Sequence, residues 1–268
     1  MREAAESDYE ARLIVSEVCG LSQLDWILNK NRPAADEEIH RCREIIARLK
    51  NHEPVQYILG SQEFMSLPFL VCPGVLIPRS DTETLVEQVI SRCAQAEKSI
   101  LEIGVGSGCI SISLAHYAKA RMTGADISDV ALKTAAENGK RCGVSVQWVR
   151  WDVMTQPPEE WTNAFDMIVS NPPYIPGGSI ETLEDKVKAY EPRLALDGGR
   201  DGLDFYRRIT ELAPRLLKDG GEIWYEIGYD QGDALRKLLA ADFTEIQIIQ
   251  DYSGNDRVAG GILKNRSS

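Results

Sequence analysis

From Ser99 onward, short apolar segments of strand length alternate with segments of helical periodicity, and this alternation restricts the fold more than any other feature. The pattern predicts strands over 99–103, up to 126, and over 144–149, 165–169, 221–227 and 246–249. It predicts helices over 110–118, from Ser128, and over 203–217 and 234–240. Strands interleaved with helices favour an α/β fold, with a mostly parallel sheet covered on both faces.

The first fifty residues have a different texture. Apolar residues recur at helical spacing before and after Pro33, so we predict a small helical domain over residues 1–53. Val55–Gly60 and Phe69–Cys72 are interpreted as two short strands of a hairpin, which makes residues 54–78 a linker. A helix is expected to begin near Asp81, inside a main domain over residues 79–268.

Composition narrows the class of partner. The formal net charge is -11, whereas a protein that binds nucleic acid tightly usually presents a basic face. The six cysteines are scattered and the three histidines lack metal-ligand spacing, so no metal site is expected. The start of the chain is polar and acidic, and no segment has the ~20 consecutive apolar residues of a membrane span. We expect a cytoplasmic protein, by default a monomer, that binds neither membrane nor nucleic acid.

A glycine-rich turn follows the first strand of the main domain. Glycines there let backbone amides approach a ligand at the carboxyl edge of the sheet. A dinucleotide site uses nearly the same device, but Cys109 stands where its fingerprint requires a last glycine. A carboxylate just before the turn would repel a pyrophosphate and attract the amino group of a methionine moiety. We therefore predict that the turn binds S-adenosylmethionine through Glu102, Gly104, Val105, Gly106, Ser107 and Gly108.

Two further carboxylates follow the next two strands. Asp126 ends the second strand, where it can accept hydrogen bonds from both ribose hydroxyls. Asp152 follows the third strand, where it can read the amino group of an adenine ring, with Val153 packed on that ring. All three residues are predicted to bind the cofactor.

The most specific segment is Asn171-Pro172-Pro173-Tyr174, which directly follows the strand beginning at Phe165. The prolines fix the backbone. The Asn171 side-chain oxygen and the Pro172 carbonyl can then each accept one N–H of a planar NH2 group, against which Tyr174 can stack. Such positioning favours attack by a poorly nucleophilic amide nitrogen on an activated methyl group. We predict that Asn171, Pro172 and Tyr174 are catalytic and bind the substrate.

These motifs resemble those of the HemK/PrmC-type release factor glutamine methyltransferases, and the resemblance covers nearly the whole chain. Asn-Pro-Pro-Tyr alone is shared with adenine-N6 DNA methyltransferases, so the flanking blocks select the family. The blocks are Glu53–Gly60, Glu63-Phe64, Leu76–Arg79, Gly104–Gly108, Asn171–Ile175, Glu191-Pro192, Asp201–Leu203, Glu226–Gly228 and Asp251–Arg257. Two departures are Ser80-Asp81, where the family usually has Pro-Glu, and Val105, where it usually has Thr.

The resemblance implies a seven-stranded, Rossmann-like class I methyltransferase domain. It also implies N5-methylation of the glutamine in the Gly-Gly-Gln motif of class 1 peptide chain release factors, with the helical domain helping to dock them. Carried over by position, it implies that Asn171 contacts the cofactor, as do Gly104, Gly106, Gly108 and Asp126, and that Asn171, Pro172, Pro173 and Tyr174 bind the substrate glutamine. Three alternatives stay open: a glutamine methyltransferase acting on a ribosomal protein, an adenine-N6 nucleic-acid methyltransferase, and a cofactor-binding module without catalysis. The sequence leaves open whether Arg79, Glu191 and Glu226 are functional or structural.

Overall fold

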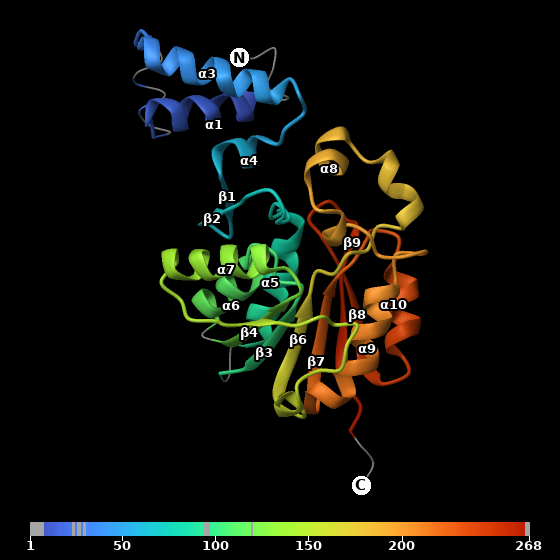
Figure 1. Cartoon of the computed structure of the whole chain (residues 1–268). Helices are drawn as coiled ribbons and strands as arrows, with labels where there is room; N and C mark the ends of the chain where they lie inside the picture. Colours follow the sequence, from blue (N-terminus) through green and yellow to red (C-terminus); the bar gives the residue numbers. More distant parts are fainter. Residues whose placement is uncertain are drawn as a thin grey trace.

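The computed structural model describes residues 8–22, 25, 28, 31–93, 97–118 and 120–265. The remaining positions of the predicted 1–53 segment lie outside the described residues. Within it, helices α1 (Asp8–Cys19) and α3 (Asp36–Leu49) pack side by side above the rest of the chain (Figure 1). Their apolar faces meet around the buried side chains of Ile14, Ile45 and Val55. This small cluster is separate from the two larger clusters that flank the sheet.

The prediction of a strand over Val55–Gly60 is wrong: Val55–Leu59 forms the short helix α4. Pro54 precedes its first turn, and Gly60 ends it in the left-handed region with φ +74°. The β-branched and aromatic residues that suggested a strand are retained because Val55 and Tyr57 are buried, Val55 against α1 and α3. Tertiary packing therefore decides the conformation here, against the local propensity.

The hairpin lies one turn later, in β1 (Ser61–Phe64) and β2 (Leu67–Leu70). Met65 and Ser66 form its two-residue turn, both with positive φ, as a type I′ turn requires. The fully buried Asn138 ties this hairpin to the main domain. Its Oδ1 accepts the Leu70 N–H at 2.7 Å, and its Nδ2 donates to the carbonyls of Leu70 and Ser107 at 3.0 and 2.9 Å.

The main domain contains a seven-stranded sheet in the order β5-β4-β3-β6-β7-β9-β8. Strands β3, β4, β5, β6 and β7 run parallel to one another, whereas β9 is antiparallel to both β7 and β8. The predicted α/β fold with a mostly parallel, methyltransferase-type sheet is confirmed. The bounds are β3 (Ser99–Ile103), β4 (Arg121–Asp126), β5 (Gln147–Arg150), β6 (Phe165–Ser170), β7 (Leu217–Glu226), β8 (Phe243–Gln250) and β9 (Asp256–Leu263).

Helices cover both faces of this sheet, as Figure 1 shows. Side chains of α5 (Asp81–Arg92) and α6 (Cys109–Tyr117) enter one core cluster, beside α7 (Asp129–Arg141). Those of α9 (Asp204–Leu216) and α10 (Gly232–Leu239) enter the other. Shorter helices lie in the connections: η1 (Glu159–Trp161), η2 (Gly177–Thr182), α8 (Asp185–Tyr190) and η3 (Arg193–Ala195).

Strand β9 was not among the strands that the apolar pattern predicted. Its centre carries two glycines, which weaken a strand signal. The structure explains Gly260: a Cβ built there would lie 2.2 Å from the Trp224 ring on β7. The glycine thus admits a fully buried indole into the middle of the sheet.

Candidate active site

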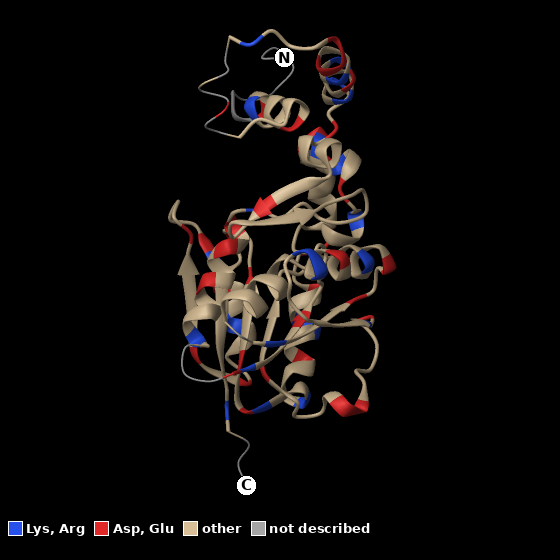
Figure 2. Ribbon diagram, turned by 90° about the vertical axis from the view of Figure 1, so that its left-hand side faces the viewer, with Lys and Arg blue, Asp and Glu red and all other residues tan. Residues whose placement is uncertain are grey.

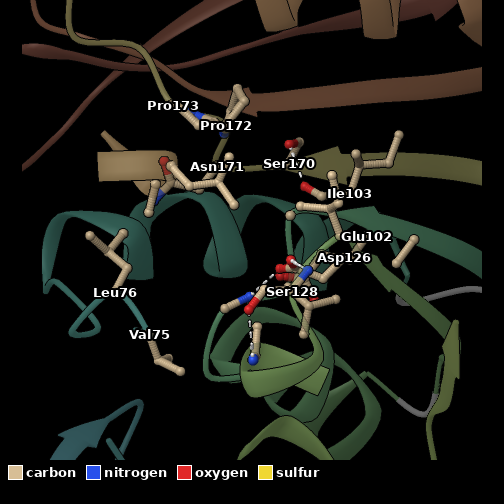
Figure 3. A pocket seen from close by; sticks show the side chains of 18 of the residues that line it. Val75, Leu76, Glu102, Ile103, Asp126, Ser128, Ser170, Asn171, Pro172 and Pro173 are labelled. Atoms are coloured by element: carbon tan, nitrogen blue, oxygen red, sulfur yellow. Dashed lines mark hydrogen bonds between the residues drawn. The ribbon is translucent and has the colours of Figure 1, made fainter. Parts of the chain in front are cut away.

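The carboxyl ends of the adjacent strands β4, β3 and β6 meet at a cavity of about 320 Å³. Parallel α/β sheets characteristically bind ligands at this edge. Figure 3 shows Glu102, Asp126 and Ser128 on one side of the cavity, and Asn171, Pro172 and Pro173 on another. The predicted residues that line it are Glu102, Gly104, Val105, Gly106, Ser107, Asp126, Asp152, Val153, Asn171, Pro172 and Pro173.

The glycine-rich turn has the conformation that its composition predicts. Gly104 and Gly106 have φ of +82° and +56°, and the Gly104 N–H donates to the Ala125 carbonyl at 2.9 Å. Gly108 is not among the residues that line the cavity. A Cβ at Gly108 would lie 2.9 Å from the Ala135 Cβ on α7, so this glycine lets two helices approach each other. Its predicted contact with a cofactor stays a prediction.

Glu102 is completely buried in the wall of the cavity. One carboxylate oxygen, Oε2, accepts the Ser111 backbone N–H at 2.9 Å and the Ser111 hydroxyl. The other, Oε1, has no hydrogen-bond partner among the described residues. Burial raises the pKa of Glu102 to about 8, against the lowering effect of the Ser111 hydrogen bonds. A buried oxygen without a partner beside a cavity is a site prepared for a hydrogen-bond donor or a cation.

Asp126 and Asp152 are held by backbone N–H groups. The two Asp126 oxygens accept the N–H groups of Gly106 and Ser128, at 3.0 and 2.8 Å. Asp152 Oδ1 accepts the Met154 N–H at 2.9 Å. Both carboxylates line the cavity, each with lone pairs left to accept further donors. They are therefore oriented before any ligand arrives.

The Asn171-Pro172-Pro173 segment leaves β6 at the opposite wall. Just before it, the buried Ser170 hydroxyl donates to the Ile103 carbonyl at 2.6 Å, which ties β6 to β3. The half-buried Asn171 donates from Nδ2 to the Thr82 hydroxyl at 3.3 Å. This hydrogen bond assigns the NH2 group of Asn171 to Thr82 and leaves Oδ1 as the atom available to a ligand.

Tyr174 does not line the cavity; its ring packs on the core cluster beside α9 and α10. Burial raises its pKa to about 12. Glycines of the 196–203 segment allow it to approach the backbone of Pro173 and Tyr174 closely. A Cβ at Gly198 would lie 2.7 Å from the Pro173 carbonyl, and one at Gly202 would lie 2.3 Å from the Tyr174 carbonyl. The stacking role of Tyr174 stays a prediction.

Sequence reasoning missed two hydroxyls of the site, Thr82 and Ser111. Both are buried and lie in helices that begin next to the cavity, α5 and α6. For Ser111 the available signal was a polar residue near the start of the otherwise apolar helix α6, whereas α5 is polar along much of its length and gives no such signal for Thr82. The pattern alone does not say that Ser111 meets Glu102 or that Thr82 meets Asn171, because these contacts arise only when the helices pack.

Comparison with known proteins supports the family resemblance that the sequence motifs indicated. Residues 1–60 match the family model of the PrmC N-terminal domain, and residues 79–198 match that of the methyltransferase small domain. A release factor glutamine methyltransferase from Geobacter sulfurreducens is 42% identical, over 94% of this chain and 88% of that protein. One from Moorella thermoacetica is 41% identical, over 92% and 88%. This chain belongs to the release factor glutamine methyltransferase family.

Solved structures support the fold of this methyltransferase. A methyltransferase from Pyrococcus furiosus aligns with a TM-score of 0.55 over 87% of this chain and 100% of that chain, at 16% identity. A ribosomal protein L11 methylase from Lactobacillus delbrueckii subsp. bulgaricus aligns with a TM-score of 0.52, over 74% and 84%, at 18% identity. At these identities the likeness shows the fold alone. Among the described helices, none is long and apolar enough to cross a membrane.

In this methyltransferase the helical region sits against the main domain beside the site. Arg79, which lines the active-site cavity, forms an ion pair with the buried Glu191. The Tyr190 hydroxyl donates to the Asn51 carbonyl at 2.7 Å, and the Tyr57 hydroxyl donates to the Val75 carbonyl at 2.6 Å. A second cavity, of about 470 Å³, is lined from both sides of this junction, by Leu49, His52 and Glu53 and by Val187 and Glu191.

Proposed function

We propose that this enzyme transfers a methyl group from S-adenosylmethionine to the side-chain amide nitrogen of the glutamine in the Gly-Gly-Gln motif of a class 1 release factor. The observation that carries the proposal is the pairing of two groups across one cavity. The partnerless carboxylate oxygen of Glu102 lies in one wall, and the amide of Asn171 lies in another. The first suits a cationic amino acid moiety, and the second suits a planar NH2 group.

The residues present fit the cofactor. Glu102 Oε1 would accept the methionine amino group, which relieves a buried unpaired oxygen. Asp126 would accept the ribose hydroxyls, and Asp152 with Val153 would meet the adenine ring. When bound, S-adenosylmethionine supplies a methyl group that is already activated by a sulfonium. The chain therefore needs no metal and no strong base at this site.

The chain's own contribution is to hold the glutamine nitrogen. Asn171 Oδ1 and the Pro172 carbonyl would accept its two N–H groups and favour the positive charge that grows on nitrogen during attack. Because Pro172 and Pro173 fix the backbone, these acceptors are placed before the substrate arrives. The proton that the nitrogen loses can pass to water afterwards.

A protein substrate agrees with the rest of the molecule. The Tyr190–Asn51 hydrogen bond joins the helical region to the main domain, and the second cavity lies at this junction, where Arg79 lines both it and the active-site cavity. A protein substrate could therefore contact both regions at once. Figure 2 shows acidic and basic residues interspersed along the ribbon of both regions, and the formal net charge is -11. Such a surface does not favour the phosphate backbone that an adenine-N6 methyltransferase acting on nucleic acid must bind.

The test is methyl transfer from labelled S-adenosylmethionine to release factors, ribosomal proteins and duplex DNA offered in parallel. Peptide mass spectrometry should locate one added methyl group on the Gly-Gly-Gln glutamine. A release factor with that glutamine replaced by alanine is the matched control and should stay unlabelled. Label in ribosomal protein alone, or in DNA, would keep the chemistry of Asn171 and discard the proposed substrate.

A further inference from the structure

Three residues from distant parts of the chain converge behind the acceptor site. In the pairing of β6 with β7, Ser170 lies opposite Tyr225, so Asn171 and Glu226 stand at neighbouring strand ends. Thr82, in the first turn of α5, lies between them and is 2% exposed. Thr82 lines the cavity, whereas Glu226 does not, so Glu226 can influence a ligand only through its neighbours.

The hydrogen bonds among these residues have a single consistent direction. Asn171 Nδ2 donates to the Thr82 hydroxyl at 3.3 Å. The Thr82 hydroxyl also lies near Glu226, where hydrogen bonding from it lowers the pKa of that buried carboxyl. An ionised carboxylate can only accept, and a hydroxyl has one proton to give. When Thr82 gives its proton to the ionised Glu226, it can only accept from Asn171, which agrees with the Asn171 NH2 group facing Thr82.

We propose that Thr82 and Glu226 are positioning residues, which fix the polarity of the Asn171 amide so that its oxygen faces the substrate. This inference rests on the proposed function, in which that oxygen accepts an N–H of the substrate glutamine. The two ends of an amide side chain have nearly the same shape, so packing alone does not select one orientation. A chain of hydrogen bonds from Asn171 through Thr82 to the Glu226 carboxylate, called the relay below, does select one orientation.

A reversed Asn171 would defeat the site. Its NH2 group would then meet the NH2 group of the substrate, and two donors repel each other instead of forming a hydrogen bond. The glutamine nitrogen would lose one of its two acceptors, together with the electrostatic assistance that this acceptor gives during attack. Cofactor binding would be affected far less, because Glu102 and Asp126 depend on other elements.

The relay depends on the ionisation of Glu226. Burial raises the pKa of this carboxyl to about 7, and its Oε2 has no hydrogen-bond partner among the described residues. A protonated Glu226 can donate to Thr82, which frees the Thr82 proton for Asn171 Oδ1 and reverses the amide. Other charged or titratable groups also face Glu226: Arg257 on β9, Arg79 and Asp81 at the start of α5, Tyr174 after β6, Tyr206 on α9 and Cys109 on α6.

The first test compares three variants at saturating S-adenosylmethionine and release factor. Thr82→Val removes the hydroxyl while keeping the shape, and kcat should fall by roughly tenfold to hundredfold. Thr82→Ser keeps the hydroxyl and should restore most of the rate. Thr210→Val removes another buried hydroxyl, which is bonded to Tyr225 at 3.0 Å outside the site, and should leave kcat unchanged. Equal kcat in Thr82→Val and the wild type would overturn the proposal.

The dependence on pH separates polarity from simple packing. In the wild type and in Thr82→Ser, kcat should fall as pH drops through about 7, because the protonated Glu226 no longer fixes the relay. The residual kcat of Thr82→Val should not show this fall at acidic pH. An acid limb that is identical in all three proteins would assign it to another group and remove Glu226 from the relay.

A measurement without turnover makes the failure of this proposal distinguishable from failure of the proposed function. In protein labelled with 15N-asparagine, the side-chain NH2 signals of Asn171 can be assigned by their loss in Asn171→Asp. They should titrate near the pKa of Glu226 in the wild type and stay constant in Thr82→Val. Identical titrations would overturn the relay. A wild type that fails to methylate release factors would instead reject the substrate, with the amide titration still readable.

Discussion

The two sides of the active-site cavity are built in different ways. The side proposed to bind the cofactor, called the cofactor side below, comes from one continuous stretch, in which β3, the glycine-rich turn, α6 and the end of β4 supply Glu102, Ser111 and Asp126. The transfer side comes from segments far apart in the sequence: Thr82 on α5, Asn171 after β6, Gly198 and Gly202 before α9, and Glu226 at the end of β7. A local motif therefore describes the first side well and the second side poorly.

This difference predicts separable effects. Backbone N–H groups orient the carboxylates of the cofactor side, so its geometry follows from the local chain alone. The transfer side depends on side chains and glycines that meet only after the whole sheet has formed. Changes on the transfer side should abolish turnover while cofactor binding stays detectable, and changes on the cofactor side should raise the dissociation constant for the cofactor.

The largest effect is expected for Asn171→Ala. This variant loses the oxygen that accepts the substrate N–H, and methylation should fall by about a thousandfold or more. Its affinity for S-adenosylmethionine, measured by calorimetry, should weaken but stay detectable. Asn255→Ala, an exposed asparagine far along the chain, is the control and should keep full activity. Equal turnover by Asn171→Ala and the wild type would remove Asn171 from the chemistry.

Gly202→Ala should damage the transfer side without touching any proposed ligand contact. Its Cβ would lie 2.3 Å from the Tyr174 carbonyl, at a φ of +76°, so the Asn-Pro-Pro-Tyr segment must shift. A displacement of this size should lower methylation by roughly a hundredfold, while cofactor affinity stays near that of the wild type. Gly220→Ala has a similar φ of +69° with nothing within 4 Å, so it tests backbone strain alone. If both variants lose the same activity, the close approach is not the cause.

The sequence predicted most of the sheet for a physical reason. Buried parallel strands such as β3 and β6 are mostly apolar over their length, and their ends in Gly104 and Asn171 leave little choice of conformation. The sequence pattern gave the wrong secondary structure where a residue type is explained by tertiary packing and not by local conformation. Val55 and Tyr57 are buried residues of the short helix α4. Gly260 interrupts the apolar pattern of β9 because it makes room for the Trp224 ring.

The site divides along the same line. Glu102 and Asp126 could be predicted because their place beside a strand end fixes where they point. Thr82 could not, since its partner Asn171 follows it by 89 residues in sequence and Glu226 lies still further along the chain. The role of Gly202 was equally hidden, because what it accommodates is a carbonyl of another loop.

On the cofactor side, Asp126→Ala should raise the dissociation constant for S-adenosylmethionine by about tenfold or more, since hydrogen bonds to a charged group contribute roughly 1.5–3 kcal/mol. The variant also loses the acceptor that orients the Gly106 and Ser128 N–H groups. Asp129→Ala is a matched control, because that nearby aspartate pairs with Arg150 on the surface. Calorimetry that finds unchanged affinity in Asp126→Ala would exclude it from the cofactor site. With the cofactor saturating, kcat should change little, which is the reverse of the Asn171 result.

The smallest expected effect is a pH dependence of cofactor affinity, which would distinguish the cofactor side from the transfer side. Burial raises the pKa of Glu102 to about 8, so in the free enzyme this carboxyl is partly protonated at neutral pH. Pairing with a cationic amino group requires the carboxylate, and binding must therefore release a proton. Cofactor affinity should weaken as pH falls below about 8, by at most about tenfold for each pH unit, since one pKa unit corresponds to about 1.4 kcal/mol.

Glu102→Gln cannot release this proton, so its affinity should be weaker at neutral pH and nearly independent of pH between 6 and 7.5 in the same buffers, roughly the window below the Glu102 pKa. Methylthioadenosine, which lacks the amino acid moiety, should bind the wild type without the pH dependence. Calorimetry in buffers of different ionisation enthalpy would count the released proton directly. If S-adenosylmethionine and methylthioadenosine show the same pH dependence, the proton comes from elsewhere and Glu102 does not meet the amino group. If only S-adenosylmethionine shows it, the partnerless oxygen has its partner, and the cofactor side is tuned by the burial of one carboxyl.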